Sequence, residues 1–128
     1  MKKLFLLLLV PLILATQCED DLDSGFETTY LIENTSSLDL TYLSPEDNLV
    51  QVPLGETLIL GSTLNSVTSP ILPSEAFIFN RIKLYNNQND NFILVYNQEP
   101  ITNELWEFSE PTVNEFEYKL IITDDLLD

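Results

Sequence analysis

The sequence predicts an all-β protein, an antiparallel β-sandwich of seven or eight strands, preceded by a segment of different character. Three observations predict this fold. Short segments in which apolar and polar residues alternate recur along the chain, and turn-forming residues separate them at intervals of about ten residues. No segment beyond the N-terminal one has the apolar spacing of a helix. With 128 residues, the chain is long enough for one domain.

The N-terminal half is expected to contain four short strands: TTYLIEN, LDLTYL, LVQVP and ETLILG. In the first of these, alternation places Tyr30 and Ile32 on the same face. Residues 45–48 (PEDN) and 53–56 (PLGE) have the composition of turns. Residues 62–75 contain two prolines, four serines and two threonines, and we expect them to form a long loop that crosses between the sheets.

The segment AFIFNRIKLY, residues 76–85, is expected to be one long strand. Alternation places Phe77 and Phe79 on the same face as Arg81 and Lys83. These two cations are among the few in the chain, so they are candidates for binding an anionic ligand or an acidic partner. The alternative, which we favour, is that they neutralise acids on neighbouring strands, each pair adding little stability.

The remaining segments complete the expected sandwich. After a polar hairpin loop (NNQND), DNFILVY places Phe92, Leu94 and Tyr96 on one face, and a short strand surrounds Trp106. The last segment, NEFEYKLIIT, has the clearest alternation in the chain. Four of its residues are expected to face the core: Phe116, Tyr118, Leu120 and Ile122. Strands of this number and spacing are typical of an immunoglobulin-like or similar sandwich.

The N-terminal segment has the pattern of a secretory signal peptide, residues 1–17. It begins Met1-Lys2-Lys3, and residues 4–15 carry no charge. An apolar run of this length is too short for a helix that crosses a bilayer, which needs about 20 residues. A positive start, a short apolar run and a polar boundary are the parts of a signal peptide. The only cysteine of the chain, Cys18, follows directly.

The segment LATQC, followed by EDDLD, resembles the lipoprotein signals of Bacteroidota. The resemblance implies that Cys18 receives lipid and becomes the mature N-terminus, although Gln17 departs from the small residue usual before the cysteine. It also implies that the acids that follow are an export signal to the outer face of the outer membrane: Glu19, Asp20, Asp21 and Asp23. The alternatives are a simple solvated tether and a lipid anchor that faces the periplasm.

We expect residues 18–27 to form the lipidated acidic tether and residues 28–128 to form the sandwich. The body loosely resembles small flavobacterial lipoproteins, a likeness that implies no particular activity. All 21 acidic residues follow Lys2 and Lys3, and removing these two of the five bases leaves a formal charge of −18. Nucleic acid is therefore not an expected partner, and attachment to a membrane must depend on lipid at Cys18. Solubility is a simpler explanation of the acidity than an acidic binding site.

Few side chains are suited to catalysis. The chain has no histidine, and its cysteine belongs to the expected anchor, so Ser-His-Asp and Cys-His catalysis and the usual zinc sites are excluded. Acids gather in sequence around Trp106, whose ring is a candidate platform for a sugar: Glu99, Glu104, Glu107 and Glu110. We favour the alternative in which Trp106 is a core residue and the acids form a solvated edge.

A calcium site is the remaining ionic candidate. Carboxylate and amide oxygens are available at Asp47 with Asn48, and at Asp124, Asp125 and Asp128 near the C-terminus. None of these groups has the spacing of a known calcium loop. We therefore predict neither a metal site nor a cofactor.

The leading functional hypothesis is a non-catalytic binding domain, lipid-anchored at the outer membrane, whose partner is a glycan or a protein. The alternatives are a structural accessory subunit of an envelope complex and, less favoured, a glycan hydrolase that uses two carboxylates. A binding module is expected to have a concave aromatic patch with a polar rim. A subunit is expected to have a flat apolar face or an unprotected edge strand.

Overall fold

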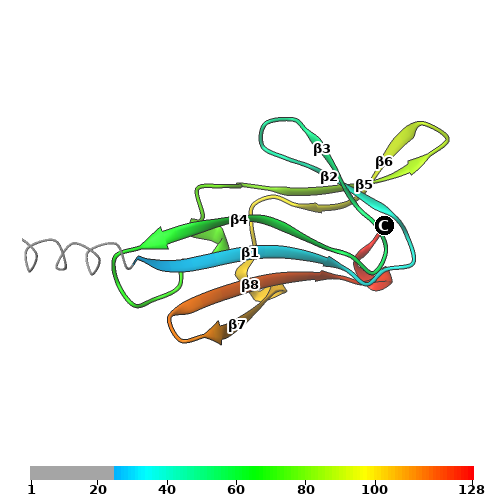
Figure 1. The fold of residues 1–128 in the computed structure, drawn as a ribbon. Helices are drawn as coiled ribbons and strands as arrows, with labels where there is room; N and C mark the ends of the chain where they lie inside the picture. Colours follow the sequence, from blue (N-terminus) through cyan, green and yellow to red (C-terminus); the bar gives the residue numbers. More distant parts are fainter. Residues whose placement is uncertain (1–24) are drawn as a thin grey trace, which may run out of the picture.

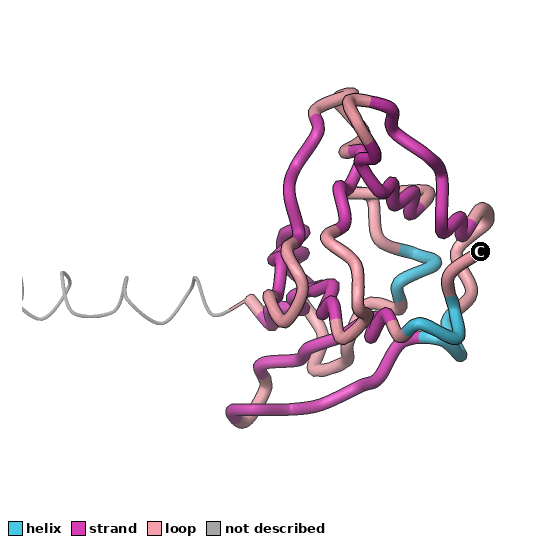
Figure 2. Tube along the Cα trace, turned by 90° about the vertical axis from the view of Figure 1, so that its right-hand side faces the viewer, coloured by secondary structure: helices cyan, strands magenta, loops and turns pink. Residues whose placement is uncertain are grey.

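The computed structural model describes residues 25–128, which form two four-stranded sheets packed face to face (Figure 1). The strands are β1 (Phe26–Asn34), β2 (Leu40–Leu43), β3 (Leu49–Val52), β4 (Thr57–Asn65), β5 (Ile82–Gln88), β6 (Asn91–Gln98), β7 (Trp106–Thr112) and β8 (Glu115–Ile122). The first sheet has the order β4-β1-β8-β7, and the second has the order β3-β2-β5-β6. The predicted β-sandwich of seven or eight strands is confirmed. Figure 2 shows the strands of the domain in a view turned by 90° from that of Figure 1.

Three single-turn 3₁₀ helices complete the described secondary structure: η1 (Pro73–Glu75), η2 (Asn103–Leu105) and η3 (Asp124–Leu126). Within residues 25–128, no helix is long and apolar enough to span a membrane. The predicted signal peptide, Cys18 and the acids that follow it lie outside the described residues. The first strand begins at Phe26, two residues before the expected start of the sandwich.

One strand pair departs from the expected antiparallel arrangement. The first and last strands, β1 and β8, run parallel side by side from Glu27 opposite Glu115 to Asn34 opposite Ile122. Every other described pair is antiparallel. These two strands form the centre of the first sheet, and their inward side chains lie at the middle of the core. Tyr30, Ile32, Leu120 and Ile122 are fully buried, as alternation predicts.

Aromatic rings fill the space between the first sheet and the segment that precedes β5. The ring of Phe79 stacks on Trp106 with centroids 5.5 Å apart, and it meets Tyr30 edge-on at 5.3 Å. Tyr30 also stacks on Tyr118 at 6.2 Å. Such pairs each contribute roughly 0.5–1.5 kcal/mol beyond the burial of their surface. These four rings, the aromatic cluster, therefore fix how the segment that precedes β5 packs on the first sheet.

The structure corrects the expected extent of two segments between the sheets. Strand β4 continues to Asn65, so the crossing loop begins later than residue 62. Strand β5 begins only at Ile82, because residues 76–81 turn rather than extend. Phe79 is buried whereas Phe77 is 99% exposed, so the two rings do not share a face. The turn allows Phe79 to reach the aromatic cluster, which straight alternation along one strand does not permit.

The hairpin of β5 and β6 has a shorter loop and a different register from those expected. Its turn consists of Asn89 and Asp90, both with positive φ, which is the conformation of a tight type I′ turn. The register then shifts by one residue: Tyr85 pairs with Leu94, and Leu84 pairs with Tyr96. Val95 is the extra residue of this bulge.

Because of the bulge, the residues of β6 before Val95 alternate between the two faces of the sheet in the opposite sense to Tyr96 and the residues after it. Leu84 and Tyr96 are buried and point toward the core, whereas their neighbours in the ladder, Tyr85 and Leu94, lie on the opposite face. Phe92, two residues before Leu94, lies on that outer face as well. The expectation that Phe92, Leu94 and Tyr96 share one face is therefore wrong. The inserted residue changes the alternation between Leu94 and Tyr96.

Candidate functional site

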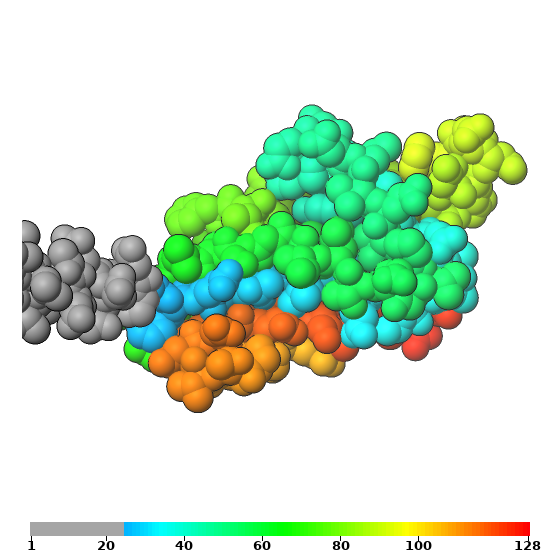
Figure 3. All heavy atoms as spheres, viewed as in Figure 1, coloured from blue at the N-terminus to red at the C-terminus, as the bar shows by residue number. Residues whose placement is uncertain are grey.

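The described domain has a hollow of about 370 Å³ on the outer face of the second sheet. Its lining comes from β2, β3 and their flanking residues on one side and from the β5–β6 hairpin on the other. The lining residues are Asp39, Leu40, Thr41, Leu49, Gln51, Pro53, Asn87 and Phe92. In Figure 1 the β2–β3 and β5–β6 hairpins diverge at the top of the molecule, and in Figure 3 the tip of the second hairpin stands apart. A hollow of this volume is in the range of small-ligand sites.

The hollow exists because β2 is short. Only Thr41 and Tyr42 pair with β5, so the hairpin of β5 and β6 continues past the point where β2 begins. Asn86 holds the stem of the hairpin in place, because its side-chain amide donates a 3.0 Å hydrogen bond to the carbonyl oxygen of Asp39. The hairpin therefore extends beyond the sheet as a wall of the hollow.

Two apolar side chains of the lining are about half exposed. Phe92 is 46% exposed and Leu49 is 52% exposed, and Pro53 lies beside them. Phe92 faces the hollow because the bulge at Val95 turns it away from the core. It supplies one aromatic ring, which offers a flat apolar surface to a ligand.

Polar groups form the rest of the lining. Gln51 and Asn87 carry exposed side-chain amides, each with a donor and an acceptor. Asp39 supplies the one carboxylate, and its Oδ1 accepts a 3.0 Å hydrogen bond from the backbone N–H of Leu54. That hydrogen bond orients the carboxylate at the rim. The hollow thus combines an aromatic ring with amide and carboxylate groups, the pattern expected of a binding module.

Trp106, a predicted platform for a sugar, is a core residue. It is 5% exposed, and its Nε1–H donates a 3.0 Å hydrogen bond to Oε1 of Gln98. Gln98 in turn donates from Nε2 to the hydroxyl of Tyr96 over 2.7 Å. Glu104, Glu107 and Glu110 are exposed around it. The favoured interpretation, a core tryptophan within a solvated acidic edge, agrees with these positions, and a sugar cannot stack on the buried ring.

The two cations proposed as ligand-binding groups have acidic neighbours. A guanidinium nitrogen of Arg81 lies 3.6 Å from Asp47, and Nζ of Lys83 lies 3.7 Å from Glu99. Neither cation lines the hollow. This geometry favours the interpretation that they neutralise nearby acids. Because the pairs are partly solvated, each adds at most about 1 kcal/mol to stability.

The acids considered for calcium have other roles or stand apart. Asp124 accepts hydrogen bonds from the backbone N–H and the hydroxyl of Ser37, at 2.8 and 2.9 Å. These bonds hold the pKa of the Asp124 carboxyl below its usual range. Asp47 pairs with Arg81. Within residues 25–128, no group of three or more acidic, cysteine or histidine residues is placed to hold a metal ion.

Sequence reasoning did not identify the hollow. Asp39 and Gln51 were not among the candidate site residues, and Phe92 was expected to share a face with Leu94 and Tyr96. The alternation of LDLTYL and LVQVP does place Thr41 and Gln51 outward, but nothing in the sequence indicates the bulge that turns Phe92 toward them. The site therefore depends on a register that only the folded hairpin reveals.

Comparisons of the chain with protein-family models, with curated proteins and with solved structures found no significant match. No function is therefore transferred from a relative.

Proposed function

We propose that this protein is a non-catalytic binding domain, lipid-anchored at the outer membrane, and that the hollow beside Phe92 receives a neutral, hydroxyl-rich ligand such as the end of a glycan. The observation that carries the proposal is the exposed ring of Phe92 beside the amides of Gln51 and Asn87. Sugar rings present an apolar face and a hydroxyl edge. An aromatic ring covers the first, and amides and carboxylates bind the second.

Charge narrows the class of ligand. Four of the 21 acids lie in the tether segment, so residues 25–128 carry 17 acids against three bases, Arg81, Lys83 and Lys119. Each of these bases lies within 4.0 Å of an acid. A polyanionic glycan or nucleic acid would be repelled by such a surface. A neutral ligand is not repelled. Its hydroxyl groups can form hydrogen bonds with both the donors and the acceptors of the two amides.

The lining of the hollow supports binding rather than hydrolysis. Cleavage of a glycosidic bond by carboxylates requires two of them on either side of the bond, about 5–10 Å apart. Asp39 is the only acid that lines the hollow, and the chain contains no histidine to act as a second acid or base beside it.

Binding to an array of neutral oligosaccharides tests the role of the hollow. We expect the full chain to bind at least one of them, and Phe92→Ala to weaken that binding by about tenfold, since each lost stacking contact costs roughly 1–2 kcal/mol. Phe77→Ala is the matched control, because Phe77 is exposed but does not line the hollow. Absence of binding to every neutral sugar, or equal losses in the two variants, would contradict the proposal.

The location at the membrane is proposed from the N-terminal sequence. The resemblance of LATQC and EDDLD to Bacteroidota lipoprotein signals supports lipid at Cys18 and display at the cell surface. A lipid anchor also explains how so acidic a domain stays at an anionic membrane.

Protease treatment of intact cells separates the surface from the periplasm. We expect the wild-type domain to be digested, and a variant with alanine at Glu19, Asp20, Asp21 and Asp23 to be protected, because the variant lacks the acidic export signal. A matched variant with alanine at Glu104 and Glu107 keeps the signal while it also loses acid, and it should be digested. Protection of all three proteins would show that the domain faces the periplasm.

A further inference from the structure

The four edge strands of the sandwich are protected to different degrees. Edge strands invite pairing with other chains, and proteins usually prevent this with charge, proline, short length or a covering segment. Strand β7 contains Glu107, Glu110 and Pro111, and β3 has only four residues. The edge of β6 is capped, because the backbone N–H of Asp128 donates a 2.9 Å hydrogen bond to the carbonyl oxygen of Val95.

Strand β4 lacks these protections. Its nine residues, TLILGSTLN, include neither a charged residue nor a proline. On one side it pairs with β1 along its length, and on the other side it makes no backbone hydrogen bond to the described residues. Figure 3 shows β4 as a continuous surface band beside β1. The one irregularity in this edge is a bulge next to Gly61, where the register with β1 shifts.

The side chains of β4 indicate that the first sheet stops one strand short. On the inner face, Leu58 and Leu60 pack against the core but remain only partly buried, whereas Ile32 on the adjacent strand is fully buried. On the outer face, Ile59 is 64% exposed and Leu64 is 73% exposed. A further strand alongside β4 would cover apolar surface on both faces and would satisfy the free backbone groups.

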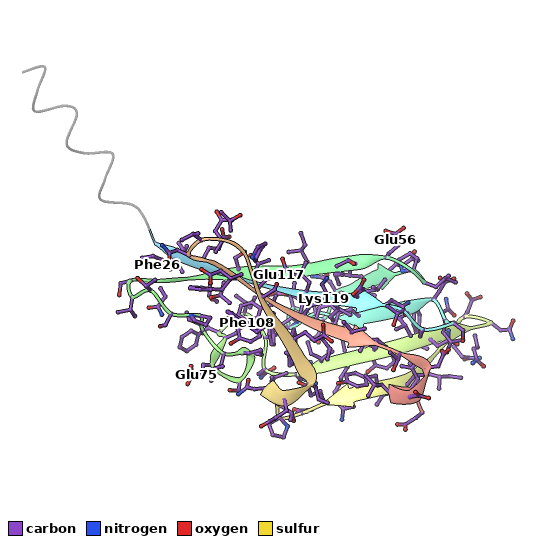
Figure 4. The ribbon with its side chains drawn as sticks, turned by 90° about the horizontal axis from the view of Figure 1, so that it is seen from below. Phe26, Glu56, Glu75, Phe108, Glu117 and Lys119 are labelled. Atoms are coloured by element: carbon purple, nitrogen blue, oxygen red, sulfur yellow. The ribbon has the colours of Figure 1, made fainter. Side chains whose placement is uncertain are left out.

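Charge identifies the kind of strand that fits. Glu27 and Glu33 of β1 lie opposite Leu64 and Thr57 of β4, and Glu56 directly precedes β4. Figure 4 labels Glu56, and it also labels Glu117 and Lys119 on β8. The Nζ atom of Lys119 lies 3.8 Å from the carboxylate of Glu33. An added strand would lie about 10 Å from β1, within about one Debye length of these acids.

From this edge we propose that β4 accepts an extended segment of a basic polypeptide, which adds a fifth strand to the first sheet. Apolar side chains of the segment cover Leu58 and Leu60, and a lysine or arginine side chain on the opposite face lies near Glu27. A second copy of this chain does not suit the edge, because it brings another 17 acids against three bases. The site is distinct from the hollow, which lies on the other sheet.

Three synthetic peptides test the proposal against the full chain by fluorescence anisotropy. The first alternates lysine and valine over nine residues, the length of β4. The second has the same composition with the lysines and valines in separate blocks, and the third alternates glutamate and valine. We expect the first to bind at least tenfold more tightly than either of the others. Equal affinity for the two lysine peptides would show attraction by charge alone and would overturn the proposal.

A charge substitution on the strand locates the site. Ile59→Lys with Leu64→Lys places two cations on the proposed edge, and we expect it to weaken binding of the alternating lysine peptide at least tenfold. Val113→Lys with Leu105→Lys is the matched control, since these residues are 80% and 43% exposed and flank β7, the opposite edge of the first sheet. Circular dichroism checks that each variant is folded. Equal losses in both variants would overturn the assignment to β4, and so would a wild-type dimer that the β4 substitutions dissociate, because a second copy would then occupy the edge.

Discussion

Asn34 joins the two sheets through its side chain at the end of β1. Its amide nitrogen donates to the carbonyl oxygens of Leu38 and Val52, at 2.8 and 2.9 Å, and its Oδ1 accepts from the N–H and hydroxyl of Ser36. The residue is fully buried, and its bonds to Val52 and Ser36 are buried with it. Leaving one such buried partner unsatisfied costs about 1–3 kcal/mol. One amide therefore stabilises the chain reversal that leads to the hollow.

Tyr42 is expected to make the domain less stable as the pH rises into the alkaline range. Burial raises the pKa of Tyr42 to about 12, with a smaller contribution from Glu46 in the same direction and an opposing one from Arg81. Between pH 10 and 12, the unfolded chain loses a proton that the folded chain retains, so this stability is complete below pH 10 and is lost above it. From pH 9 to pH 11, we expect the free energy of unfolding to fall by about 1 kcal/mol less in Tyr42→Phe than in the wild type.

Urea unfolding at these two pH values measures the effect. The other buried tyrosines, Tyr30, Tyr96 and Tyr118, also have pKa values raised by burial, but they are present in both proteins and cancel in the comparison. If the two proteins lost the same free energy of unfolding on going to pH 11, ionisation of Tyr42 would not contribute.

At the scale of elements, two bulges lie in the strands that carry the candidate binding surfaces. The bulge at Val95 turns Phe92 toward the hollow, and the bulge beside Gly61 lies in the open edge of β4. Each inserts one residue into an otherwise regular ladder and bends the strand that carries it. Both candidate binding surfaces therefore lie where regular pairing is interrupted.

Gly61 is required by the β4 bulge. Its φ of +149° is rarely adopted by other residues, and a Cβ atom there would lie 3.0 Å from Cδ1 of Ile78. We expect Gly61→Ala to lower the free energy of unfolding by about 1–3 kcal/mol. Urea unfolding measures this, with Gly25→Ala as the control, because a Cβ at Gly25 would make an ordinary contact of 3.4 Å with Leu64. An equal effect of both substitutions would mean that the bulge needs no glycine.

The elements that the sequence predicted are those with uninterrupted alternation. In β8 the inward set of Phe116, Tyr118, Leu120 and Ile122 is buried as expected, and the turns after Leu43 and Val52 form where proline and glycine indicated them. Three errors lie at the end of an element or at a bulge: the turn before β5, the late end of β4 and the bulge in β6. A fourth, the parallel pairing of β1 with β8, concerns the order of strands in the sheet. Tertiary contacts decide such features. The hollow was not predicted because the bulge at Val95 decides the face on which Phe92 lies.

At the scale of the whole molecule, acidity opposes the compact state. Residues 25–128 carry 17 acids and three bases, so folding brings like charges together. Raising NaCl from about 0.02 to 0.5 M shortens the Debye length from roughly 20 Å to 4 Å and screens this repulsion. We expect the Tm to rise by about 5 °C over that range. The double variant Glu56→Gln with Glu104→Gln should have a higher Tm than the wild type in low salt, and its Tm should rise less as NaCl is added. A Tm that falls as salt rises would contradict this expectation.

The parallel pairing of β1 with β8 also has a consequence for how the protein is made. The two central strands of the first sheet are the first and the last that the structure describes, so the core around Tyr30 and Leu120 cannot close until β8 has been synthesised. Contacts so distant in sequence form slowly, because a long loop must be closed first. In a partly synthesised chain that lacks β8, β1 therefore has no partner on one side and this core stays open.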